Sequence, residues 1–281
     1  MNTPRISASS YSNTAPLVWS FLYGRGRGSV EIILDNAPAR SAELLAEGRV
    51  DAALVPVIAS QFIEGVRLVP GVCVGAKESV RSVCIVTNGQ ALEDVRSISL
   101  DVSSRTSVAL TKIIFREFLG HEPEWRDAPP DISAMLAASD AALLIGDPAL
   151  AISSGVAGGG HDYRVFDLVE LWKKHTGLGF VFAMWMTRHE RLSIDLAAAR
   201  DEGLAHLDEI AANYAGDIGL SVEAMKTYLS INISYTPDSG MLQGMELYLD
   251  LAAWQAIFSD SSSKWKAQPF RTTRRPWSFL P

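Results

Sequence analysis

The sequence predicts an α/β protein in which strands alternate with helices in a doubly wound arrangement. Two observations lead to this class. Through about the first two-thirds of the chain, short apolar strands run directly into segments that have an apolar helical face. The chain also has 281 residues, of which 48% are hydrophobic, and this is enough for one large or two modest lobes with their own cores.

The first part of the chain is expected to form most of one lobe. Strands are predicted at residues 5–9, 30–35, 51–55, 72–75 and 82–87. The helices between them are predicted to carry a proline in their first turn, at Pro16, Pro38 and Pro56. We place the crossing into a second lobe near residues 86–89.

The second lobe is expected to follow the same pattern before the chain returns to the first. Its strands are predicted at residues 98–102, 124–127 and 141–145, and a return strand at 180–186. The last third predicts helices at 192–215, 222–229 and 240–258, with a tail at 259–281 packed on the surface. Lobe one is therefore predicted as residues 1–87 plus 180–281, and lobe two as residues 88–179.

A run of hydroxyl and arginine side chains opens the helix after the strand at 98–102. It comprises Ser103, Ser104, Arg105, Thr106 and Ser107. The first N–H groups of a helix lack partners inside the helix, and the helix dipole adds partial positive charge there. Such a run either caps an ordinary helix or forms a site for a carboxylate or phosphate.

Three other strand-to-helix junctions repeat this design, and the repetition favours a binding site. Asn13 or Thr14 is expected to cap the first helix, and Pro56 opens another. Asp147 is expected to cap a helix whose first position is Pro148. Because the carboxyl ends of parallel strands lie at one edge of a sheet, where ligands bind, these junctions are expected to lie together.

Composition and motifs narrow the function classes. The net charge is −7 and no basic stripe is present, so nucleic acid is not an expected partner. No apolar segment could span a bilayer and no signal peptide precedes the first strand, so we expect a cytoplasmic protein without a membrane partner. Cys73 and Cys84 are expected to be buried thiols. The scattered histidines and the lack of a dinucleotide motif predict no metal and no cofactor.

Seven segments, taken in order, resemble one enzyme family. They are residues 11–17, 51–56, 79–83, 103–107, 144–147, 167–172 and 176–183. The family is chorismate dehydratase of the futalosine route to menaquinone. The resemblance implies a type 2 periplasmic-binding-protein-like fold, with two lobes, a hinge and an interlobe cleft. The sequence departs from the family at Gly179, where a proline is expected after Thr-Gly-Leu.

The resemblance also implies a reaction and its site residues. Chorismate would lose its ring hydroxyl and the neighbouring ring proton, giving 3-[(1-carboxyvinyl)oxy]benzoate and water. Asn13 and Ser82 are expected to be catalytic, by orienting the enolpyruvyl carboxylate and the departing hydroxyl. Substrate contacts are expected from Thr14, Pro56, Ser104, Arg105, Thr106, Ser107 and Asp147. Because the uncharged residues of this set are poor bases and Asp147 is better explained as a cap, the substrate's own carboxylate is predicted to remove the proton.

Structural alternatives exist for several of these residues. Asn13 could simply cap its helix, Arg105 could brace a lobe, and Ser82 could be a small residue tolerated in a strand. For the whole chain, the alternative is a cytoplasmic binding protein or sensor for a small carboxylate, which would need the same polar cleft. The oligomeric state is left open.

Overall fold

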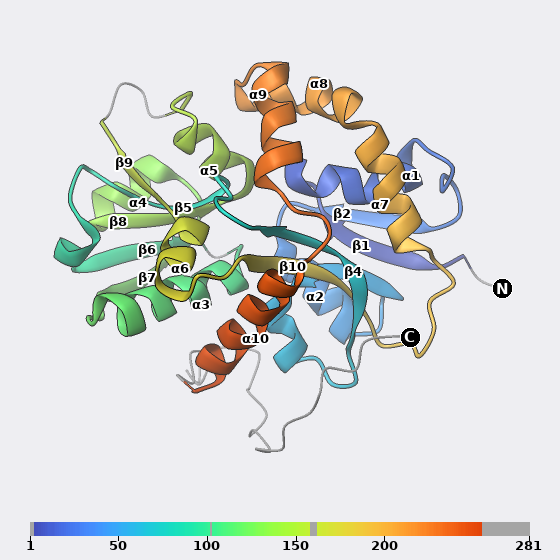
Figure 1. The fold of residues 1–281 in the computed structure, drawn as a ribbon, viewed down its shortest axis with the longest axis horizontal. Helices are drawn as coiled ribbons and strands as arrows, with labels where there is room; N and C mark the ends of the chain where they lie inside the picture. Colours follow the sequence, from blue (N-terminus) through green and yellow to red (C-terminus); the bar gives the residue numbers. More distant parts are fainter. Residues whose placement is uncertain (1–2, 102, 158–161, 255–281) are drawn as a thin grey trace.

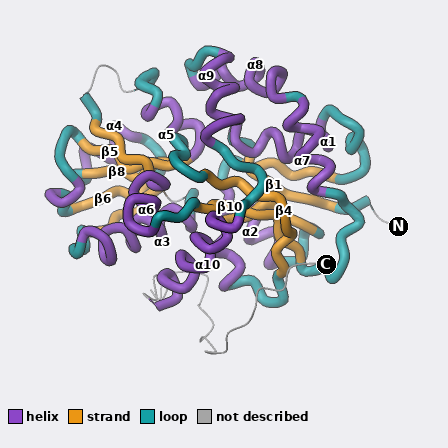
Figure 2. Tube along the Cα trace, viewed as in Figure 1, coloured by secondary structure: helices purple, strands orange, loops and turns teal. Residues whose placement is uncertain are grey.

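The computed structural model describes residues 3–101, 103–157 and 162–254, and it contains two five-stranded sheets. The two sheets lie next to each other across the molecule, with helices above and below them (Figure 1). Figure 2 shows the same arrangement by element type, with strands between layers of helices. The fold class is therefore α/β with two lobes, as the sequence predicts.

The sheet of lobe one has the strand order β2-β1-β3-β10-β4. Its strands are β1 (Arg5–Ser9), β2 (Glu31–Asp35), β3 (Ala52–Pro56), β4 (Arg67–Ala76) and β10 (Phe180–Thr187). β1 pairs in parallel with β2 and β3, whereas β10 runs antiparallel to β3 and β4. Pro56 does not begin a helix as predicted: it ends β3 with extended backbone, and a short 3-10 helix η2 (Val57–Gln61) follows.

The sheet of lobe two has the order β7-β6-β8-β5-β9. Its strands are β5 (Val83–Thr87), β6 (Ser97–Asp101), β7 (Glu124–Ala128), β8 (Ala141–Ile145) and β9 (Arg164–Asp167). The prediction that lobe one extends to residue 87 is wrong for β5, which pairs with β8 and β9. Since β4 and β5 are both apolar strands, the local pattern did not show that the chain changes sheets between them, at residues 77–82.

The first crossing is held by one carboxylate of lobe two. Asp167 Oδ2 accepts the backbone N–H groups of Val80 at 2.9 Å and Arg81 at 2.6 Å. Its other oxygen accepts the N–H of Val169 at 2.8 Å and so caps the next helix. Arg81 has a φ of 59°, a left-handed conformation that costs a non-glycine residue free energy. The second crossing, at residues 177–179, leads directly into β10.

Helices follow the strands as the alternation predicts. They are α1 (Ala15–Leu22), α2 (Pro38–Ala46), α3 (Arg105–Ile113), α4 (Ile132–Ala138), α5 (Gly146–Ser153) and α6 (Leu168–Thr176). Shorter turns are η1 (Ser12–Thr14) and η3 (Leu92–Asp94), and α3 continues as a π-helix, η4 (Ile114–Leu119). In lobe one, α1 and α2 lie on opposite sides of the sheet (Figure 1).

The C-terminal helices contact both lobes. They are α7 (Leu196–Ala205), α8 (Leu207–Ile218), α9 (Val222–Thr227), the π-helix η5 (Tyr228–Asn232) and α10 (Ser239–Trp254). α7 packs on α1, α8 on α5, and α10 on both β10 and α3, so these helices return to lobe one and also contact lobe two. The prediction of a single helix at 192–215 is wrong. The helical segment is divided at His206 into α7 and α8, and the His206 ring stacks on Trp19 with centroids 3.7 Å apart.

Some predictions fall outside the described residues. They are the tail at 259–281 and the last residues of the helix predicted to reach 258.

The departure from the family at Gly179 has a packing explanation. A Cβ atom on Gly179 would lie 2.7 Å from Met241 Cγ, and one on Gly244 would lie 2.1 Å from the Gly179 carbonyl oxygen. The two glycines therefore allow α10 to pack directly against the second crossing.

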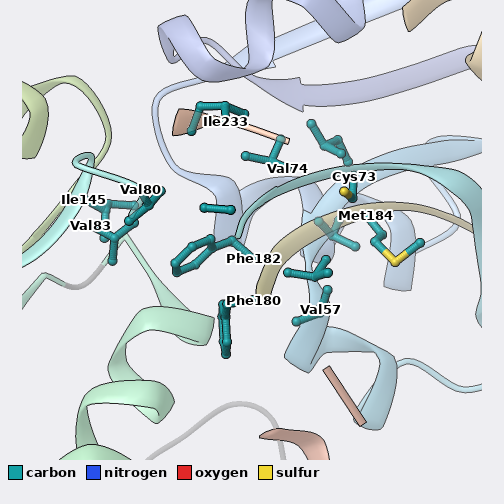
Figure 3. Packing of buried hydrophobic residues seen from close by; sticks show 14 of the residues in the cluster. Val57, Cys73, Val74, Val80, Val83, Ile145, Phe180, Phe182, Met184 and Ile233 are labelled. Carbon is teal, nitrogen blue, oxygen red and sulfur yellow. The ribbon is translucent and has the colours of Figure 1, made fainter. Parts of the chain in front are cut away.

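A single hydrophobic core runs from one lobe into the other. Val80, Val83 and Ile145 of the lobe-two side gather opposite Phe182 and the β4 side chains (Figure 3). A smaller cluster fills the other face of lobe two, with Cys84, Val86, Met135, Ala142, Leu144, Ala149 and Ile152. Cys73 and Cys84 are buried free thiols, as predicted, and they lie in different sheets.

Candidate active site

A cavity lies between the two lobes, and we call it the interlobe cavity. Its empty space, counted together with its open mouth, is about 580 Å³. Lobe one contributes Ser9, Tyr11, Asn13, Thr14, Pro38, Leu54, Pro56, Val74, Phe182 and Ala183. The crossing and lobe two contribute Val80, Val83, Ser104, Thr106, Ser107, Ile145 and Gly146. All four predicted junctions thus reach one cavity, although they come from two sheets.

The wall of the interlobe cavity has an apolar part and a polar part. Phe182 points from β10 towards the group of Val80, Val83 and Ile145 (Figure 3). Hydroxyl and amide side chains from the first loop and from α3 complete the wall. Of the described residues that line it, none carries a carboxylate, an imidazole, an ammonium or a guanidinium group. The cavity therefore offers neutral hydrogen-bond donors beside an apolar surface.

The beginning of α3 forms the most polar end of the cavity. Of the two serines that open the run, Ser104 is the N-cap, and its Oγ accepts the Ser107 N–H at 3.2 Å. Thr106 Oγ1 is buried and has no hydrogen-bond partner among the described residues. From behind, the Tyr248 hydroxyl of α10 donates to the Thr106 carbonyl oxygen at 3.1 Å. The first turn of α3 is thus fixed in place from behind, and Thr106 forms part of the cavity wall.

Arg105 lies beside this end but does not line the cavity. Its guanidinium is half-buried and lies 4.0 Å from a carboxylate oxygen of Glu43 on α2. Burial lowers the pKa of Arg105, and Glu43 partly opposes this effect. The contact joins α3 of lobe two to α2 of lobe one. This is the bracing role that the sequence left open for Arg105.

The first loop has a different local structure from the one predicted. Neither Asn13 nor Thr14 caps α1 through its side chain. Thr14 Oγ1 instead pairs with Ser9 Oγ at 2.7 Å and donates to Asn13 Oδ1 at 3.3 Å. These hydroxyls therefore orient the Asn13 amide on the cavity wall.

Asp147 does not cap α5, and this corrects the prediction. The N-cap of α5 is Ile145, whereas Asp147 accepts the backbone N–H of Ser12 at 3.2 Å and also the Ser12 hydroxyl. Burial raises the pKa of Asp147, and the Ser12 hydrogen bonds lower it in part. Asp147 is not on the cavity wall and links lobe two to the first loop of lobe one.

Ser82 lies behind the cavity wall. It is fully buried, its hydroxyl donates to the Val80 carbonyl at 3.4 Å, and its own carbonyl accepts the Gly146 N–H at 2.7 Å.

Seven of the nine predicted site residues lie on or beside the cavity. Those that line it are Asn13, Thr14, Pro56, Ser104, Thr106 and Ser107, and Arg105 adjoins it. Ser82 and Asp147 stand back from it.

Three further residues belong to the neighbourhood of the site. Tyr11 lines the cavity, and its ring covers Gly146, where a Cβ atom would lie 2.7 Å from Tyr11 Cε1. Asp101 is buried at the end of β6, where its Oδ1 accepts Ser103 hydrogen bonds while its Oδ2 has no partner in the described part of the chain. Burial raises the pKa of Asp101. Tyr228 lies against Ser82 and Asn13. Tyr11 lies in the matched segment 11–17, and Asp101 comes just before the matched segment 103–107, so the sequence offered a signal for both. No local sequence feature marks Tyr228 as a site residue.

The described residues contain no group of three or more His, Cys, Asp and Glu side chains placed to hold a metal ion. None of the described helices has the length and apolar character needed to cross a membrane.

Comparison with known proteins places the chain in a family. A sequence profile described as menaquinone biosynthesis matches residues 4–254. The chain belongs to this family. It is also 33% identical over 239 residues to the chorismate dehydratase of Thermus thermophilus, an alignment that covers 78% of this chain and 84% of that enzyme.

Solved structures place this family member in a fold class. A protein from Archaeoglobus fulgidus matches with a TM-score of 0.64 at 14% identity, over 90% of this chain and 98% of that one. The periplasmic aliphatic sulphonate binding protein of Escherichia coli matches with a TM-score of 0.62 at 16% identity, over 98% of this chain and 95% of that one. The fold is thus periplasmic-binding-protein-like, as the sequence resemblance implies.

Proposed function

We propose that this protein is a chorismate dehydratase that converts chorismate to 3-[(1-carboxyvinyl)oxy]benzoate and water. The observation that carries the proposal is the interlobe cavity, in which the unpartnered Thr106 hydroxyl and the start of α3 adjoin an apolar wall. A carboxylate fits the first and a hydrocarbon ring fits the second. Membership of the menaquinone biosynthesis family and the Thermus relative support the same activity.

The substrate carries two carboxylates, whereas the protein has a net charge of −7. Local donors must therefore outweigh an unfavourable overall field. The end of a helix contributes about 0.3–1 kcal/mol to binding an anion, and more where the site is partly buried. We assign one carboxylate to the start of α3, with donors from Thr106 and Ser107, and the ring to the side of Phe182 and Val80.

The reaction requires that a ring proton leave with the neighbouring hydroxyl. The electron pair of the broken C–H bond forms the new ring double bond, and the hydroxyl leaves as water with the proton that the base has removed. The wall has no carboxylate or imidazole among its described residues, so the enolpyruvyl carboxylate of the substrate acts as the base. It hangs from the carbon that loses the proton, and holding it there contributes on the order of 7 kcal/mol at best.

Asn13 is assigned the orientation of the enolpyruvyl carboxylate and of the departing hydroxyl. Asn13 lines the cavity wall, and the Thr14 hydroxyl donates a hydrogen bond to its Oδ1. Ser82 acts from behind the wall, where it supports the crossing next to the cavity. We also propose that the crossings at residues 77–82 and 177–179 are the hinge about which the lobes close on the substrate.

The pathway and the location follow from the same proposal. The product would enter the futalosine route to menaquinone, and the enzyme would work in the cytoplasm. Two buried free thiols are in keeping with a reducing compartment.

The activity is tested by incubating the purified protein with chorismate and following the aromatic product by mass and ultraviolet absorbance. We expect turnover that survives exhaustive chelation, because the reaction is redox-neutral and hydrogen-bond donors can assist the leaving hydroxyl. Saturable chorismate binding without product would instead identify a binding protein or sensor. Strict dependence on an added divalent ion would contradict the cofactor-free mechanism.

A further inference from the structure

Tyr228 carries a buried hydroxyl that the proposed reaction does not yet use. Its side chain is fully buried, and its Oη has no hydrogen-bond partner of acceptable geometry among the described residues. Buried phenol hydroxyls almost always find a partner, because leaving one unpaired costs free energy. An exception beside a candidate active site calls for a functional explanation.

The neighbours of this hydroxyl include the two residues expected to be catalytic, and the charges of Asp147 and Arg81 also act on it. Ser82 and Asn13 are near enough for their side chains to lower the pKa of Tyr228, although burial raises it much more. The phenol is therefore uncharged at neutral pH and keeps its proton. Asn13 comes from the first loop, Ser82 from the first crossing, and Tyr228 from the C-terminal region, so three distant segments meet here.

The backbone around Tyr228 fixes it to both the crossing and lobe one. Tyr228 is the first residue of the π-helix η5, a wide turn that is frequent at functional sites. At the other end of η5, the Asn232 amide donates to Ser79 Oγ at 3.1 Å, in the crossing. Two residues later, Ser234 exchanges backbone hydrogen bonds with Gly75 of β4 at 2.8 and 3.0 Å.

We propose that Tyr228 is a positioning residue whose hydroxyl joins the Asn13 amide to the Ser82 hydroxyl and thereby fixes the donor that Asn13 presents to the substrate. This inference rests on the proposed function. Tyr228 acts through Asn13, since it does not itself line the interlobe cavity.

The donor and acceptor inventory of the three side chains allows one chain of hydrogen bonds. Ser82 already donates to the Val80 carbonyl, so its oxygen is free to accept the Tyr228 proton. Asn13 Oδ1 accepts from Thr14, which leaves the two N–H groups of its amide. One N–H donates to the Tyr228 oxygen, and the other then faces the cavity and the substrate.

Tyr235 provides a matched control within the same segment. It is buried, and its hydroxyl also has no partner in the described part of the chain. The groups that act on it electrostatically are Tyr228 and Cys73, not Asn13 or Ser82. Replacing either tyrosine by phenylalanine removes one unpaired hydroxyl and keeps the ring that fills the core.

The experiment compares Tyr228→Phe with Tyr235→Phe by steady-state kinetics on chorismate and by thermal unfolding. We expect both variants to unfold at or slightly above the wild-type temperature. Tyr228→Phe is expected to lose at least tenfold in kcat with KM within threefold of wild type, since the effect falls on orientation. Tyr235→Phe should keep both constants within twofold. Equal losses in the two variants, or an unchanged kcat in Tyr228→Phe, overturn the inference.

A double substitution tests whether Tyr228 acts through Asn13. Adding Tyr228→Phe to Asn13→Ala should lower kcat less than threefold further, because the amide that it positions is already gone. A further tenfold loss would mean that Tyr228 acts independently, and the inference would fail. If the wild-type protein itself makes no product, the proposed function fails and the inference with it. If the wild type makes product and Tyr228→Phe turns over at the same rate, the inference is overturned but the proposed function stands.

Discussion

Thr106 combines a backbone held firmly from behind with a side chain that lacks a partner. Tyr248 fixes its carbonyl, while Oγ1 lies buried at the cavity without a hydrogen bond to any described residue. A buried hydroxyl left unpaired costs about 1–3 kcal/mol, so the unliganded protein is less stable than it could be at this position. A ligand oxygen placed there recovers that cost on binding.

Replacing Thr106 by valine is expected to separate stability from binding. The variant removes the unpaired hydroxyl, so its thermal unfolding temperature should equal or exceed that of the wild type. Substrate binding should weaken about tenfold or more, because a hydrogen bond to a charged group contributes about 1.5–3 kcal/mol. Calorimetric titration with the product checks this.

Thr111→Val is the control on the same helix. The Thr111 hydroxyl donates to the Ser107 carbonyl at 2.8 Å, so this variant should lose stability and keep its affinity. Equal affinities for wild type and Thr106→Val would show that Thr106 does not meet the ligand.

At the scale of elements, α10 supports the site from outside it. It packs on β10 and α3, and its Tyr248 holds the first turn of α3. The close approach at Gly244 and Gly179 sets how deeply α10 lies against the second crossing. The position of the first turn of α3 therefore depends in part on a contact at the second crossing.

Gly244→Ala is expected to destabilise the protein by about 1–3 kcal/mol, since its methyl group would lie 2.1 Å from a backbone oxygen that cannot easily move. Gly216→Ala on α8 is the matched control, because a Cβ there meets nothing within 4 Å. That change should stabilise the protein by about 0.5–1 kcal/mol, as alanine favours a helix interior. Chemical unfolding measures both, and a neutral Gly244→Ala would contradict the packing argument.

The elements were predictable from sequence to the extent that their causes are local. The alternation of apolar strands and helices predicted the α/β class, and the run from Ser103 to Ser107 does cap a helix, through Ser104. Asp147 was misassigned as a cap because its partner, Ser12, lies 135 residues away. β5 was assigned to the wrong lobe because an apolar strand does not show which sheet it joins. Tyr228 was missed because only the tertiary fold brings it to Asn13.

At the scale of the whole molecule, two contacts join the lobes beside the cavity. Ser12 of the first loop donates to Asp147 of α5, and the Tyr11 ring lies over Gly146. Gly146 has a φ of +66°, so a side chain there would be strained as well as crowded. These contacts link the first loop, which carries Asn13, to α5 of lobe two.

Asp147→Asn tests whether the Asp147 carboxylate only forms a hydrogen bond between the lobes or acts as the catalytic base. Because the amide oxygen still accepts from Ser12, we expect at least about a tenth of wild-type kcat, whereas Asn13→Ala should lose on the order of a hundredfold. Steady-state kinetics on both variants checks this. A loss of several thousand-fold in Asp147→Asn, with normal binding and stability, would identify Asp147 as the base.

The same variant has a pH signature in its stability. Burial raises the pKa of Asp147, so the folded protein binds this proton more tightly than the unfolded chain does. The stabilising contribution is complete below the ordinary pKa and is lost as pH rises through the folded value. Lowering the pH from about 7 towards about 4 should therefore raise the wild-type Tm relative to Asp147→Asn. Asp101 and Asp167 are present in both proteins, so their effects cancel in this comparison.

The strand order has a consequence for how the chain is made on the ribosome. β10 lies between β3 and β4, yet it follows β4 by more than the whole of lobe two in the sequence. Until β10 emerges, β4 has no neighbour in its sheet, and β3 keeps an open edge, the kind of edge that pairs with other chains. Lobe two, whose last strand ends at Asp167, can complete its sheet first. The nascent protein thus passes through a stage in which an inserted lobe is folded while its host remains open, and this stage is its period of greatest exposure to aggregation.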